Sequence, residues 1–474
     1  MIIKMTKSCP HNVDTIVTFT KFDTAPKFTC PTLQKIYDEY YGNDDTSLKA
    51  GEIKYRRIKI GEEFRNLLIV GFDCHREDAF AFFRKTVLKL GSKLKEINSK
   101  AAFIDKLTEL VFTDDKEEIV KQFAMTMPMS EYTFDKYILD KKDKQEKEIY
   151  IYGDYVEALE EANNIAEGIK ISKDLVNEPA NVLTPAELAE RTVHLGTKYG
   201  FDVKVYSKEE CEALGMSAFL AVASASVNEP KFIVMKYKGL DSDSYEGIIG
   251  KGLCYDSGGL FLKSGRSMVE EKSDMAGAAS VIGAMCAMAA NKVKKNIVAV
   301  VAACENMVDG KGYRNGDILS TMNGKSVFIG STDAEGRLTM ADALTYLVRK
   351  ENVDSIVEFS TLTGSCANFF GDVCAAVLTT DDDMYEKMVS KSTLTGEKYW
   401  RMPVFDEYKE MIKSDIADLK NKSVSAAGIC AGLFLDQFKE DKKFMHVDIA
   451  GVAFTNAKGG SGFGVKSIYY YFNR

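Results

Sequence analysis

Short apolar runs alternate with longer stretches in which apolar residues recur at helical spacing along most of the chain. In the first third, residues 67–70 form a run typical of a buried strand, whereas residues 77–90 are rich in helix formers. Residues 116–127 repeat the helical pattern, and residues 149–152 repeat the strand pattern. This alternation predicts a small α/β domain.

A long helical pattern follows and marks a boundary. It runs from about residue 155 to residue 176 and is broken at residues 177–181. A second helix start comes directly afterwards, because Thr184 can cap a helix whose first turn contains Pro185. Since 474 residues exceed what one hydrophobic core usually serves, we expect two domains. The predicted division is an N-terminal domain over 1–154, a connecting helix over 155–176 and a second domain over 177–474.

The remainder of the chain predicts a larger α/β domain. Its apolar runs are separated by helical patterns and lack the alternation of a half-exposed strand, so we expect central strands covered by helices on both faces. The predicted fold class is therefore α/β, with a smaller N-terminal α/β domain and a larger C-terminal domain built on a central mixed sheet flanked by helices. The runs lie at residues 232–235, 247–250, 297–301, 356–359 and 375–378.

Acidic and lysine side chains gather between residues 250 and 338. Carboxylates that converge in a fold repel one another, so a cation must lie among them, and a divalent metal is the simplest candidate. No histidine lies in this window, which predicts a site of oxygen ligands that can include one amine. Each cluster is expected just after a central strand, where ligands bind in open α/β sheets. The residues are Lys251, Asp256, Asp274, Asp333 and Glu335.

Two lysines, Lys251 and Lys263, flank Asp256. A lysine beside two dications has its pKa lowered, which makes a neutral amine available as a ligand or base. The other lysine can stay charged and polarise a substrate oxygen. The alternative is that both only neutralise carboxylates in a salt-bridge network. That alternative suits any single residue but is disfavoured for so many at these spacings within glycine-rich segments.

Composition narrows the class of protein. The net charge of -8 and the sequence pI near 5.4 disfavour a general binder of nucleic acid. The ten cysteines include no CxxC pair, which favours reduced thiols over a disulfide framework. The first residues lack an apolar signal core, and no run reaches the ~18 apolar residues of a membrane span. We expect a cytoplasmic protein without a membrane segment.

With these residues in view, the chain resembles the leucine aminopeptidase (cytosol aminopeptidase) family of dinuclear metallo-exopeptidases over about residues 160–474. The residues 1–159 match only in size and βα character. The matching segments lie at residues 177–181, 250–259, 272–279, 304–307, 314–317, 332–338, 361–364 and 448–451.

The resemblance implies two divalent metal ions per subunit. Zn, Mn, Mg and Co all suit such ligands, and the sequence does not choose among them. One ion would be held by Lys251, Asp256, Asp274 and Glu335. The other would be held by Asp256, Asp333 and Glu335, so that Asp256 and Glu335 bridge the pair.

The resemblance also implies how peptides with a free N-terminus are cleaved. Lys263 would stabilise the oxyanion, and Arg337 would hold a bicarbonate ion that shuttles protons; the alternative for Arg337 is a partner for Glu335. The pocket for the first side chain would include Glu271, Thr361, Gly364 and Ala450. The family usually has methionine at the position of Glu271, so we expect weaker preference for leucine and better acceptance of basic or polar residues. The implied assembly is a homohexamer.

Two other classes of function stay open. Another two-metal hydrolase, such as a phosphoesterase, would use the same carboxylates. A non-catalytic DNA-binding or scaffold role is also conceivable, but the acidic pI and the complete set of ligands disfavour it.

Overall fold

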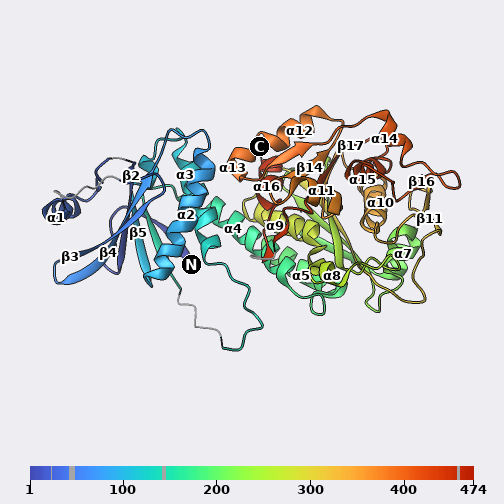
Figure 1. Ribbon diagram of the computed structural model, residues 1–474, viewed down its shortest axis with the longest axis horizontal. Helices are drawn as coiled ribbons and strands as arrows, with labels where there is room; N and C mark the ends of the chain where they lie inside the picture. The colour runs from blue at the N-terminus through green and yellow to red at the C-terminus, as the bar shows by residue number, and fades with distance from the viewer. Residues whose placement is uncertain (23, 42–47, 141–145, 456–458, 474) are drawn as a thin grey trace. The chain divides into compact units, whose positions relative to one another are not determined.

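In the computed structural model, which describes residues 1–22, 24–41, 48–140, 146–455 and 459–473, the chain divides into two compact units, Met1–Ala166 and Glu167–Arg474 (Figure 1). The division falls inside the long helix α4 (Val156–Asn177). This helix covers almost the same residues as the helical pattern expected at 155–176.

The first unit is built on a six-stranded sheet of order β1-β6-β5-β2-β4-β3, parallel except for the pair β3–β4. Its strands are β1 (Ile2–Thr6), β2 (Thr15–Lys21), β3 (Ile53–Ile60), β4 (Glu63–Phe72), β5 (Ala101–Asp105) and β6 (Glu148–Tyr152). Its helices are α1 (Pro31–Tyr41), α2 (Ala79–Glu96), η1 (Leu107–Glu109), α3 (Lys116–Thr126) and η2 (Met127–Ser130). In α2, residues Phe83, Val87, Leu90 and Leu94 recur at helical spacing and are fully buried.

The second unit is built on an eight-stranded mixed sheet of order β15-β14-β17-β13-β9-β10-β8-β7. The neighbours β17, β13, β9 and β10 are parallel, so their carboxyl ends meet at one edge. The strands are β7 (Asp202–Tyr206), β8 (Lys231–Lys238), β9 (Glu246–Asp256), β10 (Asn296–Asn306), β13 (Ser355–Ser360), β14 (Ala375–Leu378), β15 (Tyr399–Arg401) and β17 (Lys443–Asp448). Two small sheets comprise β11 (Ile318–Ser320), β12 (Ser326–Phe328) and β16 (Leu419–Lys420), and β18 (Phe454–Thr455) with β19 (Gly459–Gly460).

Helices surround this sheet (Figure 1). They are α5 (Pro185–Tyr199), α6 (Lys208–Ala213), α7 (Ser217–Ala223), α8 (Gly265–Met268), η3 (Glu271–Ser273), α9 (Ala276–Ala290), α10 (Gly336–Tyr346), η4 (Leu347–Glu351), α11 (Gly364–Phe370), α12 (Asp382–Val389), α13 (Ser392–Thr395), α14 (Asp406–Glu410), α15 (Ala427–Asp436) and α16 (Val465–Asn473). The α/β fold class is thus confirmed, with a mixed central sheet flanked by helices. All ten cysteines are free.

The small residues of α9 let it lie directly on the sheet. A Cβ on Gly250 of β9 would lie 2.6 Å from the Ala278 Cα, and one on Gly277 would lie 2.1 Å from the Phe359 carbonyl oxygen. The segment Glu271–Ala290 is long and apolar enough to cross a membrane, but 89% of its apolar window is buried inside the unit. It is therefore the core helix of this layer, and its N-terminal turn lies against Gly250 and Lys251 of β9.

Two sequence expectations about the clusters are wrong. Asp256 ends β9 as expected, but Asp274 follows η3 and Asp333 follows the small sheet that contains β12. Neither comes just after a central strand. The reason is that the chain leaves the main sheet after β9 and again after β10, and loops bring these carboxylates back to the edge.

Candidate metal and active site

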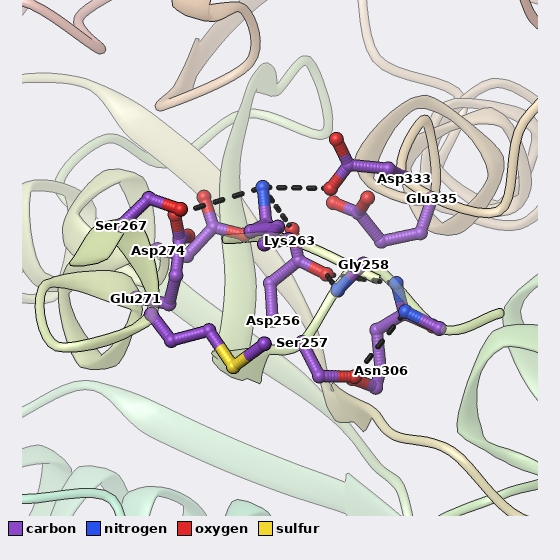
Figure 2. A network of polar contacts seen from close by, with 12 residues as sticks. Asp256, Ser257, Gly258, Lys263, Ser267, Glu271, Asp274, Asn306, Asp333 and Glu335 are labelled. Atoms are coloured by element: carbon purple, nitrogen blue, oxygen red, sulfur yellow. Dashed lines mark hydrogen bonds and ion pairs between the residues drawn. The ribbon is translucent and has the colours of Figure 1, made fainter. Parts of the chain in front are cut away.

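The acidic and lysine residues singled out in the sequence converge at the carboxyl ends of the central parallel strands (Figure 2). Asp256 is the last residue of β9 and pairs in register with Asn306, the last residue of β10. Thr361 directly follows the end of β13. This edge is where a parallel sheet offers backbone and side-chain groups to a ligand.

Lys251 is buried among three oxygen atoms. Its Nζ lies 2.9 Å from Asp274 Oδ1 and 3.0 Å from Glu335 Oε1, and it donates a 3.1 Å hydrogen bond to the Thr361 carbonyl. Burial alone would lower the pKa of Lys251, but the attraction of Asp274 and Glu335 outweighs it and raises the pKa. The lowered pKa expected beside two dications is therefore not what the protein groups alone produce.

Lys263 lies among three carboxylates on the more exposed side of the acidic site. Its Nζ lies 2.7 Å from Asp333 Oδ1, 2.9 Å from Asp256 Oδ2 and 3.6 Å from Glu271 Oε1. Its side chain is 19% exposed. Burial would lower the pKa of Lys263, but the surrounding carboxylates, Asp256 first, raise it. The surrounding carboxylates thus favour the charged ammonium.

The carboxylate of Asp256 is fixed in orientation. Its Oδ1 accepts hydrogen bonds from the Gly258 backbone N–H (2.9 Å) and from Asn306 Nδ2 (2.7 Å), so Oδ2 is left to face the lysine. Gly258 has φ +86°, and a Cβ there would lie 2.4 Å from the Phe261 carbonyl oxygen, so the turn requires glycine. The sequence pattern does not single out Asn306; its register with Asp256 at the end of β10 reveals it.

Two groups of carboxylates share Asp256. Asp333 and Glu335 form one group with it, and Glu271 and Asp274 form the other, with oxygen atoms within 4.8 Å of one another in each. Figure 2 shows Asp256 between the two groups. Burial, reinforced by repulsion from Glu335, raises the pKa of Asp256 to about 7.

The second group contains an unsatisfied atom. Burial raises the pKa of Asp274 well above its usual value, and its buried Oδ2 has no hydrogen-bond partner among the described residues. An orphaned carboxylate oxygen among other acids fits a cation, and hard oxygen donors with one amine fit a divalent metal. Glu271, which the family resemblance assigns to the substrate pocket, lies in this group and beside Lys263.

Arg337, the second residue of α10, is almost completely buried. Its Nη1 donates a 2.7 Å hydrogen bond to the Asn421 carbonyl, whereas its buried Nε has no hydrogen-bond partner in the part of the chain that the structure describes. Burial lowers the pKa of Arg337 to about 10, a value at which it still carries its charge at neutral pH. Within the described residues no ion pair of 4 Å or less joins Arg337 to Glu335, so the guanidinium keeps a free donor that suits an anion.

The remaining residues expected in the pocket lie on two neighbouring segments. Thr361 donates a 2.7 Å hydrogen bond to Asp274 Oδ1 and so joins the acidic group directly. Gly364 begins α11, and a Cβ there would meet no atom within 4 Å. Ala450 follows β17, and its N–H donates to Asp448 at 3.1 Å. Asp448 also contacts the loop that contains Thr361, so the two segments are connected.

Comparison with known proteins agrees with this geometry. Residues 170–469 match the family model for the catalytic domain of the cytosol aminopeptidase family. A probable cytosol aminopeptidase of Clostridium perfringens is 40% identical over 443 residues, which covers 90% of this chain and 89% of that protein. One of Fusobacterium nucleatum is 42% identical over 402 residues, covering 81% and 84%.

A solved structure shows the same fold. The bottromycin maturation enzyme BotP superposes with a TM-score of 0.86 at 26% identity, covering 97% of this chain and 99% of that one, and it has also been solved in complex with Mn. The family match extends over most of the second unit, and it includes every residue of the acidic site. The chain therefore belongs to the cytosol aminopeptidase family and is an aminopeptidase of the metallo-exopeptidase class.

Proposed function

We propose that this chain removes the first residue from peptides with a free N-terminus at the edge of the sheet formed by β9, β10 and β13. The observation that carries the proposal is the pair of carboxylate groups that share Asp256. One shared carboxylate between two acidic groups is the arrangement that two neighbouring dications require. The Mn complex of BotP supports a divalent metal here as well.

Two metal ions per subunit are proposed, with ligands drawn from the residues that converge. Asp256 and Glu335 would be shared, because Asp256 belongs to both carboxylate groups and Glu335 contacts Lys251, a ligand proposed for the first metal site. When bound, such ions supply Lewis acidity and an activated water. The first site comprises Lys251, Asp256, Asp274 and Glu335, and the second comprises Asp256, Asp333 and Glu335.

Lys263 and Arg337 are proposed as the catalytic side chains. The Lys263 ammonium is charged and partly exposed, so it can donate to the carbonyl oxygen of the scissile peptide as negative charge develops there. Arg337 presents a buried Nε that no described residue pairs with, which supports the binding of bicarbonate as an anion that accepts and returns a proton. None of the described residues of the acidic site is a histidine that could accept and return the proton instead.

The first side chain of the substrate is proposed to lie among Glu271, Thr361, Gly364 and Ala450. Glu271 is 19% exposed beside Lys263, so its carboxylate faces the region that a substrate enters. Its negative charge favours a basic or polar first residue over leucine. The open space around Gly364 leaves room for a side chain.

The oligomeric state and the cellular location of the protein are also proposed. A homohexamer and a cytoplasmic location are proposed from the family resemblance. Multi-angle light scattering of the purified chain tests the assembly, and a monomer at micromolar concentration would contradict it.

The test of the function is metal-reconstituted kinetics. The protein is stripped with a chelator, refilled with Mn²⁺ or Zn²⁺, and assayed for free amino acids released from dipeptides. Asp333→Ala is expected to lose at least about 100-fold in kcat/KM, whereas Asp354→Ala is expected to change nothing. Asp354 is an exposed carboxylate just before β13, at the other end of that strand. Equal rates for wild type and Asp333→Ala would overturn the function, and phosphate release from esters without amino-acid release would indicate a different two-metal hydrolase.

A further inference from the structure

Asp448 is a buried carboxylate that the proposed chemistry does not use. It is the last residue of β17 and is 2% exposed. In the described residues no ion pair of 4 Å or less reaches it; it is held instead by uncharged donors. Its Oδ1 accepts from the backbone N–H of Leu362 at 3.2 Å and of Ala450 at 3.1 Å, and its Oδ2 accepts from the Thr363 hydroxyl at 2.7 Å.

The first segment that Asp448 holds is the loop after β13. Leu362 and Thr363 directly follow Thr361, whose carbonyl accepts from Lys251 Nζ and whose hydroxyl donates to Asp274 Oδ1. Backbone displacement at Leu362 therefore moves both contacts of Thr361. Asp448 thus holds Leu362, the neighbour of Thr361, and Thr361 contacts two proposed metal ligands, Lys251 and Asp274.

The hydrogen bond between Thr363 and Asp448 also fixes the position of the first turn of α11. The Thr363 hydroxyl, while donating to Asp448, accepts from the Cys366 N–H at 3.2 Å and so caps the helix that begins at Gly364. Because an N-cap side chain fixes the position of the first turn, the orientation of Thr363 determines where Gly364 lies. Asp448 selects that orientation by accepting the hydroxyl proton.

The second segment is the turn after β17. Ser360 and Asp448 are paired in register at the ends of β13 and β17, and the Ile449 N–H donates to the Ser360 carbonyl at 2.8 Å. Ala450 then turns back so that its N–H reaches Asp448 Oδ1. One carboxylate therefore joins the two segments that carry Thr361, Gly364 and Ala450.

We propose that Asp448 is a positioning residue that holds both walls of the first-residue pocket and, through Thr361, the orientation of Asp274 and Lys251. The inference rests on the proposed function in so far as those residues line the pocket and bind metal. A carboxylate is suited to this position because its two oxygens accept all three hydrogen bonds and donate none. An asparagine would keep the two backbone bonds on Oδ1 but would turn an N–H towards Thr363, whose oxygen already accepts two donors, the Cys366 N–H and the Ser365 hydroxyl.

The direct test is hydrogen exchange by mass spectrometry on the metal-free full chain, which does not depend on activity. In Asp448→Ala, amides at residues 361–366 and 449–452 are expected to exchange at least tenfold faster than in wild type. The matched control is Asp381→Ala, which removes another carboxylate that accepts from a backbone N–H (Met384, 2.9 Å) as the N-cap of α12. That variant is expected to leave both segments unchanged. Unchanged exchange in Asp448→Ala would overturn the proposal.

The second readout is Mn²⁺ titration of the stripped protein by calorimetry, followed by steady-state kinetics at saturating metal. Substitution of groups that orient metal ligands typically costs 10–100-fold in affinity or activity. Asp448→Ala is expected to weaken Mn²⁺ binding and raise KM by about tenfold each, with Asp448→Asn in between and Asp381→Ala unaffected. Equal melting-temperature losses in the two alanine variants, with Mn²⁺ affinity and KM unchanged, would show a merely structural role and overturn it.

A folding failure of Asp448→Ala and a failure of the proposed function are distinguished as follows. If Asp448→Ala does not fold, Thr363→Val removes one of the three bonds and is expected to speed exchange at residues 361–366 alone. If wild type binds no Mn²⁺ and releases no amino acid, the proposed function fails, whereas the exchange result still decides whether Asp448 holds the two segments.

Discussion

Gly336 lies against the ammonium of Lys251, with no room for a side chain between them. A Cβ built on Gly336 would lie 2.7 Å from Lys251 Nζ and 2.6 Å from its Cε. Gly336 follows Glu335 in sequence and begins α10, so one residue controls the approach of the helix to the lysine. The absence of a side chain there is what allows Lys251 to reach Asp274 and Glu335 together.

Gly336→Ala is therefore expected to displace Lys251 and lose at least about 10-fold in kcat/KM. Overpacking of this kind also costs about 1–3 kcal/mol of unfolding free energy. The matched control is Gly310→Ala, where a new Cβ meets nothing within 4 Å. Dipeptide kinetics and urea unfolding of both variants check the prediction. Full activity in Gly336→Ala would mean that the position of Lys251 is not required.

Removal of the Arg337 guanidinium is expected to abolish the dependence of the rate on bicarbonate. Its buried Nε has no partner among the described residues, so an added anion can bind there. Because general acid–base groups contribute typically 10²–10⁴-fold, wild type is expected to lose about 100-fold in kcat when bicarbonate is removed from the buffer. Arg337→Met should show the low rate with or without bicarbonate. Arg349→Met, which removes an exposed arginine paired with Glu440, serves as the control.

The opposite result would be equally clear. If the rate of wild type does not change in bicarbonate-free buffer, the anion is not part of the reaction. Arg337 would then act only through its bond to the Asn421 carbonyl.

Much of the fold was predictable because its central strands are apolar on both faces. The runs at β8, β9, β10, β13 and β14 all proved to be strands of the main sheet. The strand β17 was not predicted, although it is central, because Lys443, His446 and Asp448 interrupt its apolar pattern. His446 bonds through Nδ1 to Glu358 on the neighbouring strand β13, which periodicity does not reveal.

The residue types of the candidate site were predictable from the sequence, but the hydrogen bonds that hold these residues in place were not. Spacing in glycine-rich segments identified the acids and lysines, and these do converge. It did not reveal Asn306, whose role depends on strand register, nor Asp448, whose role depends on bonds to a loop 85 or more residues earlier in the chain. The family resemblance assigned Glu271 to the pocket alone, because its approach to Lys263 and Asp274 depends on how η3 folds back.

Replacement of Glu271 is expected to shift the preference for the first residue. Its carboxylate is 3.6 Å from Lys263 and partly exposed, so its attraction for a basic side chain is screened. An ion pair of this kind contributes about 1 kcal/mol, or about fivefold in rate. Glu271→Met is therefore expected to lower the ratio of arginine to leucine cleavage about fivefold. Aminoacyl-coumarins with arginine, lysine, methionine and leucine measure the ratio.

Two variants separate charge from shape. Glu271→Gln keeps the size and should lower the ratio in the same direction, while the neighbouring Glu270→Met should leave it unchanged. Strong preference of wild type for leucine, together with no change in Glu271→Met, would contradict a role in substrate choice. A large loss of Mn²⁺ affinity in Glu271→Gln would instead show that this acid binds metal, as its place in the second carboxylate group allows.

The buried pair of His446 and Glu358 makes stability depend on pH. His446 Nδ1 bonds to a Glu358 carboxylate oxygen across β17 and β13, and both side chains are almost fully buried. Burial alone would lower the pKa of His446, but the negative charge of Glu358 raises it above its usual value. Asp448 raises the pKa of His446 by a smaller amount, and Arg337 lowers it. A raised pKa in the folded state gives stability that is fully present below the unfolded value of about 6.5 and is lost as the pH rises through the folded value.

Urea unfolding between pH 6 and 9 is therefore expected to show a falling midpoint in wild type and a flatter profile in His446→Gln. The exposed His194→Gln should behave as wild type. Glu358→Gln leaves a buried imidazolium without its counter-charge, which costs about 3–5 kcal/mol near pH 6, and the cost should shrink at higher pH as the imidazole becomes neutral. An equal midpoint for wild type and Glu358→Gln at pH 6 would mean that the histidine is neutral in the folded chain, and the pair would then be an ordinary hydrogen bond.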